Sequence, residues 1–531
     1  MPNVTVSPGA APVMQVPLAA QHKWALLLTA VLFKRLFWEQ WLGLNGLLFM
    51  WTAVALQLWL LPRPQRGAWP FWVAVGGTLL SGVLMALYGS VMAGVAGWVS
   101  LALVLALVRW PALRSVSYAL LTSLENFLHA GPAAANALWP AGRTADQVRR
   151  GWFYGRLLGL PVAALLVFHG LFVLANPRYA RLTEQLTEAL LRWMEWLYKA
   201  ISVGHVLFWG LAGAVAGAVV LRGAARHYAE RDAQSPEVLE RRRVRARRFF
   251  RLPDLRKQYV VALAVFGLLN ALLLLVNAID INWLWLGYHP ATALEMKQFV
   301  HEGTYVLIFS ILLAMSLVLW AFRSNLNFYV PGLPWLRRLA TAWVLQNAVL
   351  AVSVGLRNYY YIVATGLAYK RIGVCAFLLL TLFGLGTIGL KIWQRRTTYS
   401  LVRLNGWAAY ALLLALAAGN WEVWMVRYNL QRQRLHIDLS FLLELPGRAL
   451  PALHARRAVL AAPGCTPVLM RRAWAETSDV EVAPPFALQQ LAASTRAWCA
   501  EYEAHRSWQS WNYADWRAYQ TVKAASGPPV P

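Results

Sequence analysis

The chain has 531 residues, of which 59% are hydrophobic and only 14% are charged. A soluble protein of this length would form two or more domains with charged surfaces, and this chain has too few polar residues to cover them. The net charge of +27 would suit a nucleic-acid binder. However, Lys and Arg gather in short loops between apolar runs, as they do in membrane proteins. We therefore predict an all-α, polytopic transmembrane helix bundle that has membrane lipids, and no nucleic acid, as partners.

The N-terminal residues 1–22 contain Pro and Gly and no basic residue. This composition predicts a disordered tail rather than a secretory signal. Residues 23–427 form the predicted bundle, and residues 428–531 form a small polar C-terminal region outside the membrane.

Ten stretches of the bundle have about the 20 mostly apolar residues that a spanning helix needs. They are residues 42–61, 69–87, 90–108, 155–176, 200–221, 259–279, 303–322, 339–361, 372–392 and 404–425. Residues 24–38 have a shorter apolar core and residues 115–128 contain an acid, which favours interfacial or re-entrant helices for both.

The most basic loop, residues 222–258, contains the run LERRRVRARRFFRLPDLRK, which predicts a cytoplasmic location. Ser235-Pro236-Glu237 within it is typical of a helix start. The helix is expected either to be solvated or to bind anionic lipid. Alternation along ten spans then places the C-terminal region outside the cytoplasm.

One joint, residues 357–371, breaks this charge bias. It should lie outside, yet it contains Arg357, Lys370 and Arg371. Lys370 and Arg371 begin the next span, so they are expected to extend to the interface without a partner. Arg357 lies deeper, and without a partner it would cost roughly 3 kcal/mol on insertion scales.

The span that contains Arg357 has a polar stripe. At 100° per residue, the stripe comprises Gln346, Ser353, Arg357 and Tyr360, with Asn347 and Asn358 beside it. Polar side chains are costly against lipid, so the stripe should face the bundle interior or a wet cavity.

Possible partners of Arg357 lie at the same expected end of two other spans. Asn277 and Asp280 close the sixth span, and His301 and Glu302 open the seventh. We expect Arg357 to pair with Asp280 or Glu302, directly or through water. Two alternatives stay open, because such pairs either tie the helices together or form a functional site.

No motif predicts a cofactor or a metal site. Gly384, Gly386 and Gly389 match a dinucleotide-binding pattern, but they lie in an apolar span with no preceding strand. Cys465 and Cys499 are able to form a disulfide if the C-terminal region faces an oxidising compartment, and two free thiols are the alternative.

Several segments resemble a bacterial inner-membrane family that is catalogued as a domain of unknown function, numbered four-one-seven-three, with four-one-five-three as its wider relative. They are FWEQWLGLN (37–45), VNAIDINWLW (276–285), FVHEGTY (299–305), RSNLNFY (323–329), LQNAVLAVSVGLRNYYYI (345–362), YKRIGV (369–374) and HIDLSFLLELPGRALPAL (436–453). The resemblance implies a multi-pass protein of the bacterial cytoplasmic membrane. It also implies a motif that Arg357, Tyr361, Gly366-Leu367 and Arg371 match, whereas Ala368 replaces its usual Thr.

Three functions fit the polar stripe. The first is a carrier or flippase-like protein for an anionic or lipid-linked small molecule, in which Arg357 holds the anion and Lys370-Arg371 guide it. His301-Glu302 or Asp280 then exchange protons as access alternates. The second is a membrane-embedded transferase acting on lipid or glycan, with Glu302 and His301 as acid and base. The third is a non-catalytic sensor or scaffold.

Overall fold

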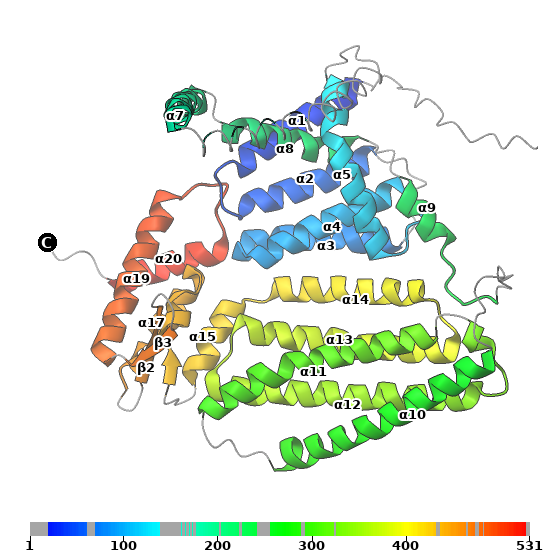
Figure 1. The fold of residues 1–531 in the computed structure, drawn as a ribbon. Helices are drawn as coiled ribbons and strands as arrows, with labels where there is room; N and C mark the ends of the chain where they lie inside the picture. The colour runs from blue at the N-terminus through cyan, green and yellow to red at the C-terminus, as the bar shows by residue number, and fades with distance from the viewer. Residues whose placement is uncertain are drawn as a thin grey trace, which may run out of the picture. The chain divides into compact units, whose positions relative to one another are not determined.

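The computed structural model describes most of the chain, and nearly all of what it describes is helical (Figure 1). The described residues are 20–60, 69–138, 161, 165, 169, 173, 177–200, 203–221, 226–241, 255–287, 293–322, 325–431, 436–462, 466–472, 477–481 and 483–526. The chain divides into two compact units. Unit 1 comprises residues 1–39 and 123–225, and unit 2 comprises residues 40–122 and 226–531.

Seven described helices are long and apolar enough to cross a membrane. They are α3 (Trp69–Tyr88), α4 (Val91–Arg109), α8 (Val203–Val220), α10 with its π-helical extension η2 (Leu255–Leu286), α12 (Leu333–Thr365), α13 (Tyr369–Gln394) and α14 (Thr398–Ala418). Two shorter apolar stretches are α2 (Leu44–Leu60) and Val306–Ala321 within α11 (Ala293–Ala321). By length and composition, these helices make the chain a multi-pass membrane protein.

Two of the ten expected spans differ from these helices. Residues 155–176 lie outside the described part, apart from isolated helical positions. The range 404–425 is wrong, because α14 ends at Ala418 and α15 (Trp421–Gln431) begins after a break. The Trp421 indole donates to the Leu416 carbonyl at 2.6 Å and so satisfies one of the groups that a helix end leaves open.

Unit 1 contains α1 (Ala20–Phe37), α7 (Pro177–Ala200), α8 and the part of α5 (Val116–Leu138) that follows Thr122. Aromatic rings join α1 to α8, with the rings of Phe33 and Phe208 stacked 5.5 Å apart. α1 begins at Ala20, two residues before the expected end of the N-terminal tail at residue 22. Residues 1–19 of that tail lie outside the described part.

The membrane helices of unit 2 pack in a series of neighbours. α2 packs on α3, α3 on α4, α4 on α14, α14 on α13 and α13 on α12. α12 also packs on α10 and α11, so three helices surround it (Figure 1). Small residues allow the closest approach: a Cβ on Gly77 of α3 would overlap the Tyr410 hydroxyl of α14, which donates to Ser100 of α4 at 2.8 Å.

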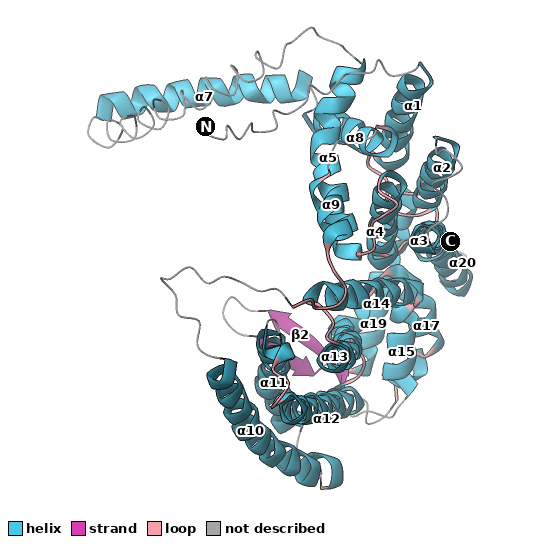
Figure 2. Ribbon diagram, turned by 90° about the vertical axis from the view of Figure 1, so that its right-hand side faces the viewer, coloured by secondary structure: helices cyan, strands magenta, loops and turns pink. Residues whose placement is uncertain are grey.

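The residues after α15 form a mixed region that belongs to unit 2. Its elements are β1 (His436–Asp438), α16 (Leu439–Leu443), η4 (Gly447–Ala449), α17 (Leu450–Ala455), α18 (Arg457–Leu460), β2 (Thr466–Arg472), β3 (Thr477–Glu481), α19 (Pro484–Ala504) and α20 (Tyr513–Ser526). The strands, shown in magenta in Figure 2, have the order β1-β2-β3, with β1 parallel and β3 antiparallel to β2. Leu439, Leu453, Leu491 and Val522 are among the side chains of its apolar core.

The segment between α19 and α20 caps the start of α2. The amides of Leu44 and Asn45 donate to the carbonyls of Trp511 and Gln509 at 2.8 and 2.9 Å. The first amides of a helix have no partner within the helix, so these bonds attach the C-terminal region to the bundle. Cys499 on α19 has a free thiol and Cys465 lies outside the described residues, so the disulfide alternative stays an expectation.

Candidate functional site

The polar stripe of α12 faces α10 and η2, as a stripe directed into the bundle should. Each of its four residues forms a hydrogen bond or an ion pair with α10 or η2. Gln346 Nε2 donates to Asn270 Oδ1 at 3.0 Å, Ser353 Oγ accepts from Trp285 at 3.0 Å, Arg357 pairs with Asp280, and the Tyr360 hydroxyl donates to the Leu284 carbonyl at 3.3 Å. We call Asn270, Asn277, Asp280, Gln346, Ser353 and Arg357 the α10–α12 seam.

The centre of the seam is the ion pair between Arg357 and Asp280. Arg357 Nη2 lies 2.6 Å from Asp280 Oδ1, and the two side chains are only 9% and 8% exposed. The predicted ion pair is therefore confirmed, with Asp280 as the partner. Asp280 is the last residue of α10, directly before η2. Single π-helical turns within helices occur frequently at functional sites.

Three buried acceptor atoms of the seam have no hydrogen-bond partner within the described residues. They are Asn277 Oδ1, Asp280 Oδ2 and Gln346 Oε1. Asn277 and Asp280 are three residues apart on α10, so they share one face, and Asn277 Nδ2 donates to the Gln346 carbonyl at 3.0 Å. Because buried polar atoms are normally paired, these oxygens require a donor such as a water or a ligand hydroxyl.

Asn347 and Asn358, expected beside the stripe, are directed elsewhere. Asn347 Nδ2 donates at 2.8 Å to the Trp343 carbonyl of its own helix. Asn358 Nδ2 donates to the Arg371 carbonyl and to Cys375 Sγ of α13, both at 3.1 Å. The structure therefore does not bring these two residues into the seam.

The turn between α12 and α13 holds Arg371 close to the chain. Its guanidinium lies 4.3 Å from the ring centre of Tyr361 and donates to the Gly366 carbonyl. The expectation that Arg371 extends to the interface without a partner is therefore wrong, while Lys370 is exposed. Gly366 ends α12 at φ +100°, a conformation that side chains strongly disfavour.

His301 and Glu302 lie within α11, and the structure does not describe their side chains. Their proximity to Arg357 stays a prediction. Within the described residues, no group of three or more His, Cys, Asp or Glu side chains is placed to hold a metal ion.

A second buried ion pair, which sequence analysis missed, joins α15 to η4. Arg448 Nε and Nη2 bind the two carboxylate oxygens of Glu422 at 3.0 and 2.6 Å, and Arg448 Nη1 donates to the Tyr88 carbonyl at 2.6 Å. The Tyr369 hydroxyl also donates to Glu422, at 2.7 Å. Burial alone would raise the pKa of Glu422, but Arg448 and Tyr369 outweigh it and lower that pKa below its ordinary value.

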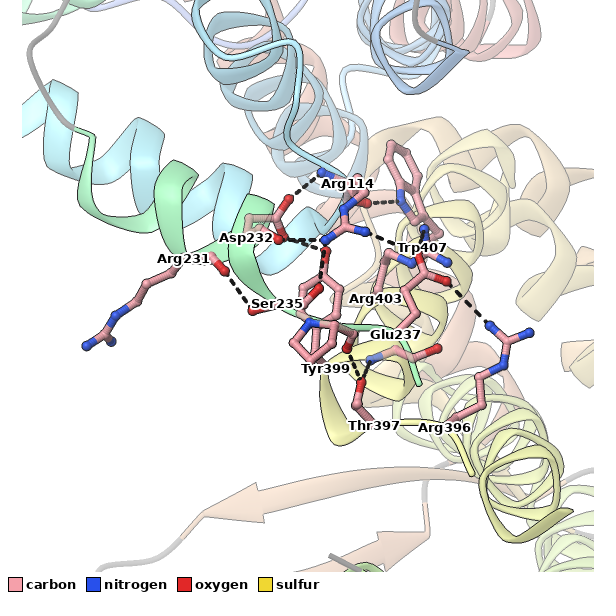
Figure 3. Close-up of polar contacts among 12 residues, drawn as sticks. Arg114, Arg231, Asp232, Ser235, Glu237, Arg396, Thr397, Tyr399, Arg403 and Trp407 are labelled. Atoms are coloured by element: carbon pink, nitrogen blue, oxygen red, sulfur yellow. Dashed lines mark hydrogen bonds and ion pairs between the residues drawn. The ribbon is translucent and has the colours of Figure 1, made fainter. Parts of the chain in front are cut away.

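Sequence analysis also missed a charged cluster at the far end of α13, shown in Figure 3. There Glu237 contacts Arg114, Arg396 and Arg403. The expected helix start at Ser235 is wrong, because α9 (His227–Gln234) ends there and the chain continues extended. The sequence feature that pointed to this charged cluster is one acid, Glu237, close to the most basic run of the chain.

A sequence profile of the family described as Domain of unknown function (DUF4153) matches residues 51–455. The chain belongs to this family. The DUF4153 match includes both ion pairs and the Glu237 cluster, but it ends before α19 and α20. No curated protein and no solved structure matches the chain. The resemblance to the family numbered four-one-seven-three stays an expectation.

Proposed function

We propose that this DUF4153 protein is a carrier or flippase-like protein of the bacterial cytoplasmic membrane that binds an anionic or lipid-linked small molecule at the α10–α12 seam. One observation supports the proposal most: Arg357 and Asp280 form a buried ion pair in which Asp280 Oδ2 has no hydrogen-bond partner among the described residues. Ionisable groups within membrane helices are costly, so they commonly mark a pathway for a ligand or a proton.

The incomplete pairing of Asp280 provides a mechanism. An anionic group of the ligand replaces Asp280 at the Arg357 guanidinium, whose forked geometry matches both carboxylate and phosphate. Release of the ligand then restores the ion pair.

The two amide oxygens of the seam define a further property of the ligand. Asn277 Oδ1 and Gln346 Oε1 are acceptors without a partner within the described residues. A ligand that complements both the cation and these oxygens carries hydroxyl or amine groups next to its anion. Phosphorylated sugars and lipid-linked sugars have this combination.

The proposed topology has ten spans, with residues 222–258 in the cytoplasm and residues 428–531 outside it. Basic residues in short loops support this orientation. The seam residues Asp280 and Arg357 then lie toward the outer side of the membrane.

Native mass spectrometry of the full-length protein, purified in a mild detergent, tests the proposal. We expect the wild type to retain an anionic molecule, and Arg357→Ala to lose it. Asp280→Asn should retain at least as much, because the competing carboxylate is gone. Lys370→Ala is the matched control, since this exposed cation lies near the same end of the bundle but outside the seam, and it should behave as the wild type.

Equal ligand content in Arg357→Ala and the wild type would refute the carrier proposal and leave the ion pair with a structural role. Folding is checked with the double variant Asp280→Asn/Arg357→Gln. This variant removes both charges, so it should recover the stability that Arg357→Ala loses while still failing to retain the ligand. The transferase alternative depends on His301 and Glu302 and predicts turnover of lipid or glycan that requires them.

A further inference from the structure

Three arginines from separate segments surround one carboxylate at the end of α13 that is distant from the seam (Figure 3). Arg114 follows α4, Arg396 lies in the α13–α14 turn, and Arg403 lies in the first turns of α14. We call these three residues the arginine cup. Their Nη1 atoms lie 3.3, 3.5 and 3.0 Å from the Glu237 carboxylate.

Glu237 neutralises the cup incompletely. One carboxylate faces three guanidinium groups, which leaves two positive charges in excess. The three distances exceed the roughly 2.7–2.9 Å of strong charge-assisted hydrogen bonds. In addition, Arg403 Nε is buried and has no hydrogen-bond partner among the described residues.

The neighbouring acid, Asp232, does not bind the guanidinium groups through its carboxylate. Its Oδ2 accepts from the Arg114 backbone amide at 2.5 Å, and its Oδ1 accepts from the Tyr399 hydroxyl at 2.8 Å. These bonds fix the polypeptide around the cup. With the charges of Glu237 and Asp232 both counted, the three arginines retain one positive charge in excess.

Arg114 of the cup is held in place by contacts that do not involve Glu237. Arg114 Nη2 donates to the carbonyls of Asp232 and Ser235 at 2.7 and 2.9 Å, and its guanidinium lies 5.1 Å from the ring centre of Tyr399. A guanidinium that is fixed in this way loses little entropy when it binds an anion.

The segment that carries Glu237 is held by its backbone. The Thr397 amide donates to the Glu237 carbonyl at 2.9 Å, and the Thr397 hydroxyl donates to the Pro236 carbonyl at 2.6 Å. The Glu237 side chain can therefore rotate away while its backbone stays in place. The four charged side chains are between 22% and 34% exposed, so a ligand can reach them from solvent.

We propose that the arginine cup binds a phosphate group, which replaces the Glu237 carboxylate. A phosphate carries more negative charge and more acceptor oxygens than a carboxylate, and forked arginines are suited to both features. The shared chemistry is a phosphomonoester or free phosphate, supplied by an anionic lipid headgroup or by solution. α13 has 26 residues, so it is about 39 Å long, and the cup lies at its C-terminal end.

The test is calorimetric titration of the full-length protein in a nonionic detergent. The probes are inorganic phosphate, short-chain phosphatidic acid and short-chain phosphatidylcholine. We expect Glu237→Gln to bind phosphate or phosphatidic acid about tenfold more tightly than the wild type, because an internal competitor is removed. Arg403→Gln should lose binding.

Two control variants come from the same segment. Arg231→Gln removes an arginine that points away from the cup in Figure 3, and Glu240→Gln removes an exposed acid just beyond Glu237. Both should bind as the wild type does. Binding of inorganic phosphate identifies a site for free phosphate, whereas binding of phosphatidic acid alone identifies a lipid headgroup, and either outcome supports the proposal.

The proposal is overturned if Glu237→Gln binds all probes no more tightly than Glu240→Gln does. Binding of phosphatidylcholine as strongly as phosphatidic acid would also overturn it. Should Arg403→Gln not fold, Arg403→Lys provides the second measurement, since it keeps the charge and removes the buried Nε. Arg403→Lys should weaken binding in the Glu237→Gln background, and unchanged binding would contradict the proposed geometry.

Discussion

Arg448 binds both carboxylate oxygens of Glu422, whereas Arg357 binds only one oxygen of Asp280. Both pairs are buried, but they differ in how completely the carboxylate is satisfied. Glu422 has Tyr369 as a further donor, while Asp280 Oδ2 has no partner within the described residues. A saturated pair is suited to holding elements together, and an unsaturated pair is suited to exchanging a partner.

The first prediction concerns the saturated pair. Arg448→Ala should destabilise the protein by about 3–5 kcal/mol, because the Glu422 carboxylate is left buried without its counter-charge. Thermal unfolding in detergent measures the effect. Arg457→Ala removes an exposed arginine from the same region and should change the stability little. A melting temperature for Arg448→Ala equal to that of Arg457→Ala would show that the pair does not hold the C-terminal region.

The second prediction concerns the pH dependence of stability through His454. This imidazole lies 2.9 Å from the Thr495 hydroxyl, and burial, followed by repulsion from Arg457, lowers its pKa below the ordinary 6.5. The folded state therefore binds this proton less readily than the unfolded state. Stability is complete above pH 6.5 and falls as the pH decreases from 6.5 toward the lowered pKa.

Unfolding at pH 7.5 and pH 5.5 measures this contribution. His454→Gln keeps a donor for Thr495 and cannot take up the proton, so its melting temperature should fall less on acidification than that of the wild type. His505→Gln replaces an exposed histidine on the same region and should retain the wild-type dependence. An identical loss in wild type and His454→Gln would exclude His454 as the source.

Part of the site was predictable from sequence because helical geometry is local. The 100° rotation per residue brought Gln346, Ser353 and Arg357 onto one face. The scarcity of acids near that end of the membrane limited the expected partners of Arg357 to Asp280 and Glu302. Which way Asn358 is directed depends on the turn that Gly366 allows, and no periodicity encodes that turn.

The other charged sites depend on contacts between distant segments. Arg114 and Glu237 are 123 residues apart, and Arg448 reaches the carbonyl of Tyr88 across 360 residues. Glu237 lies in a sequence that favours a helix start, but hydrogen bonds from Thr397 and Arg114 hold that segment extended. Tertiary contacts therefore override the local preference.

The third prediction concerns the attachment of the C-terminal region to α2. A Cβ on Gly43 would lie 2.6 Å from the Ser510 carbonyl oxygen and would overlap that of Trp511. Both obstacles are backbone atoms, so Gly43→Ala should destabilise the protein by about 1–3 kcal/mol. Gly76→Ala is the control, because a Cβ at that position on α3 meets open space. Equal thermal stability of the two variants would mean that residues 509–511 do not pack against Gly43.

The last prediction concerns the side of the membrane on which the C-terminal region lies. Ten spans and a cytoplasmic 222–258 loop place it outside, although Arg427, Arg432 and Arg434 just beyond α14 oppose this orientation under the charge bias. A reporter fused near residue 455 would remove Gln509 and Trp511, which cap α2, so the reporter belongs after Pro531. Alkaline phosphatase at that position should be active, and green fluorescent protein should be dark. The same phosphatase inserted within residues 242–250 should be inactive, since that loop is expected in the cytoplasm. A fluorescent C-terminal fusion would instead place the C-terminal region in the cytoplasm. The number of spans between the basic loop and this region, which is odd in the proposed topology, would then have to be even.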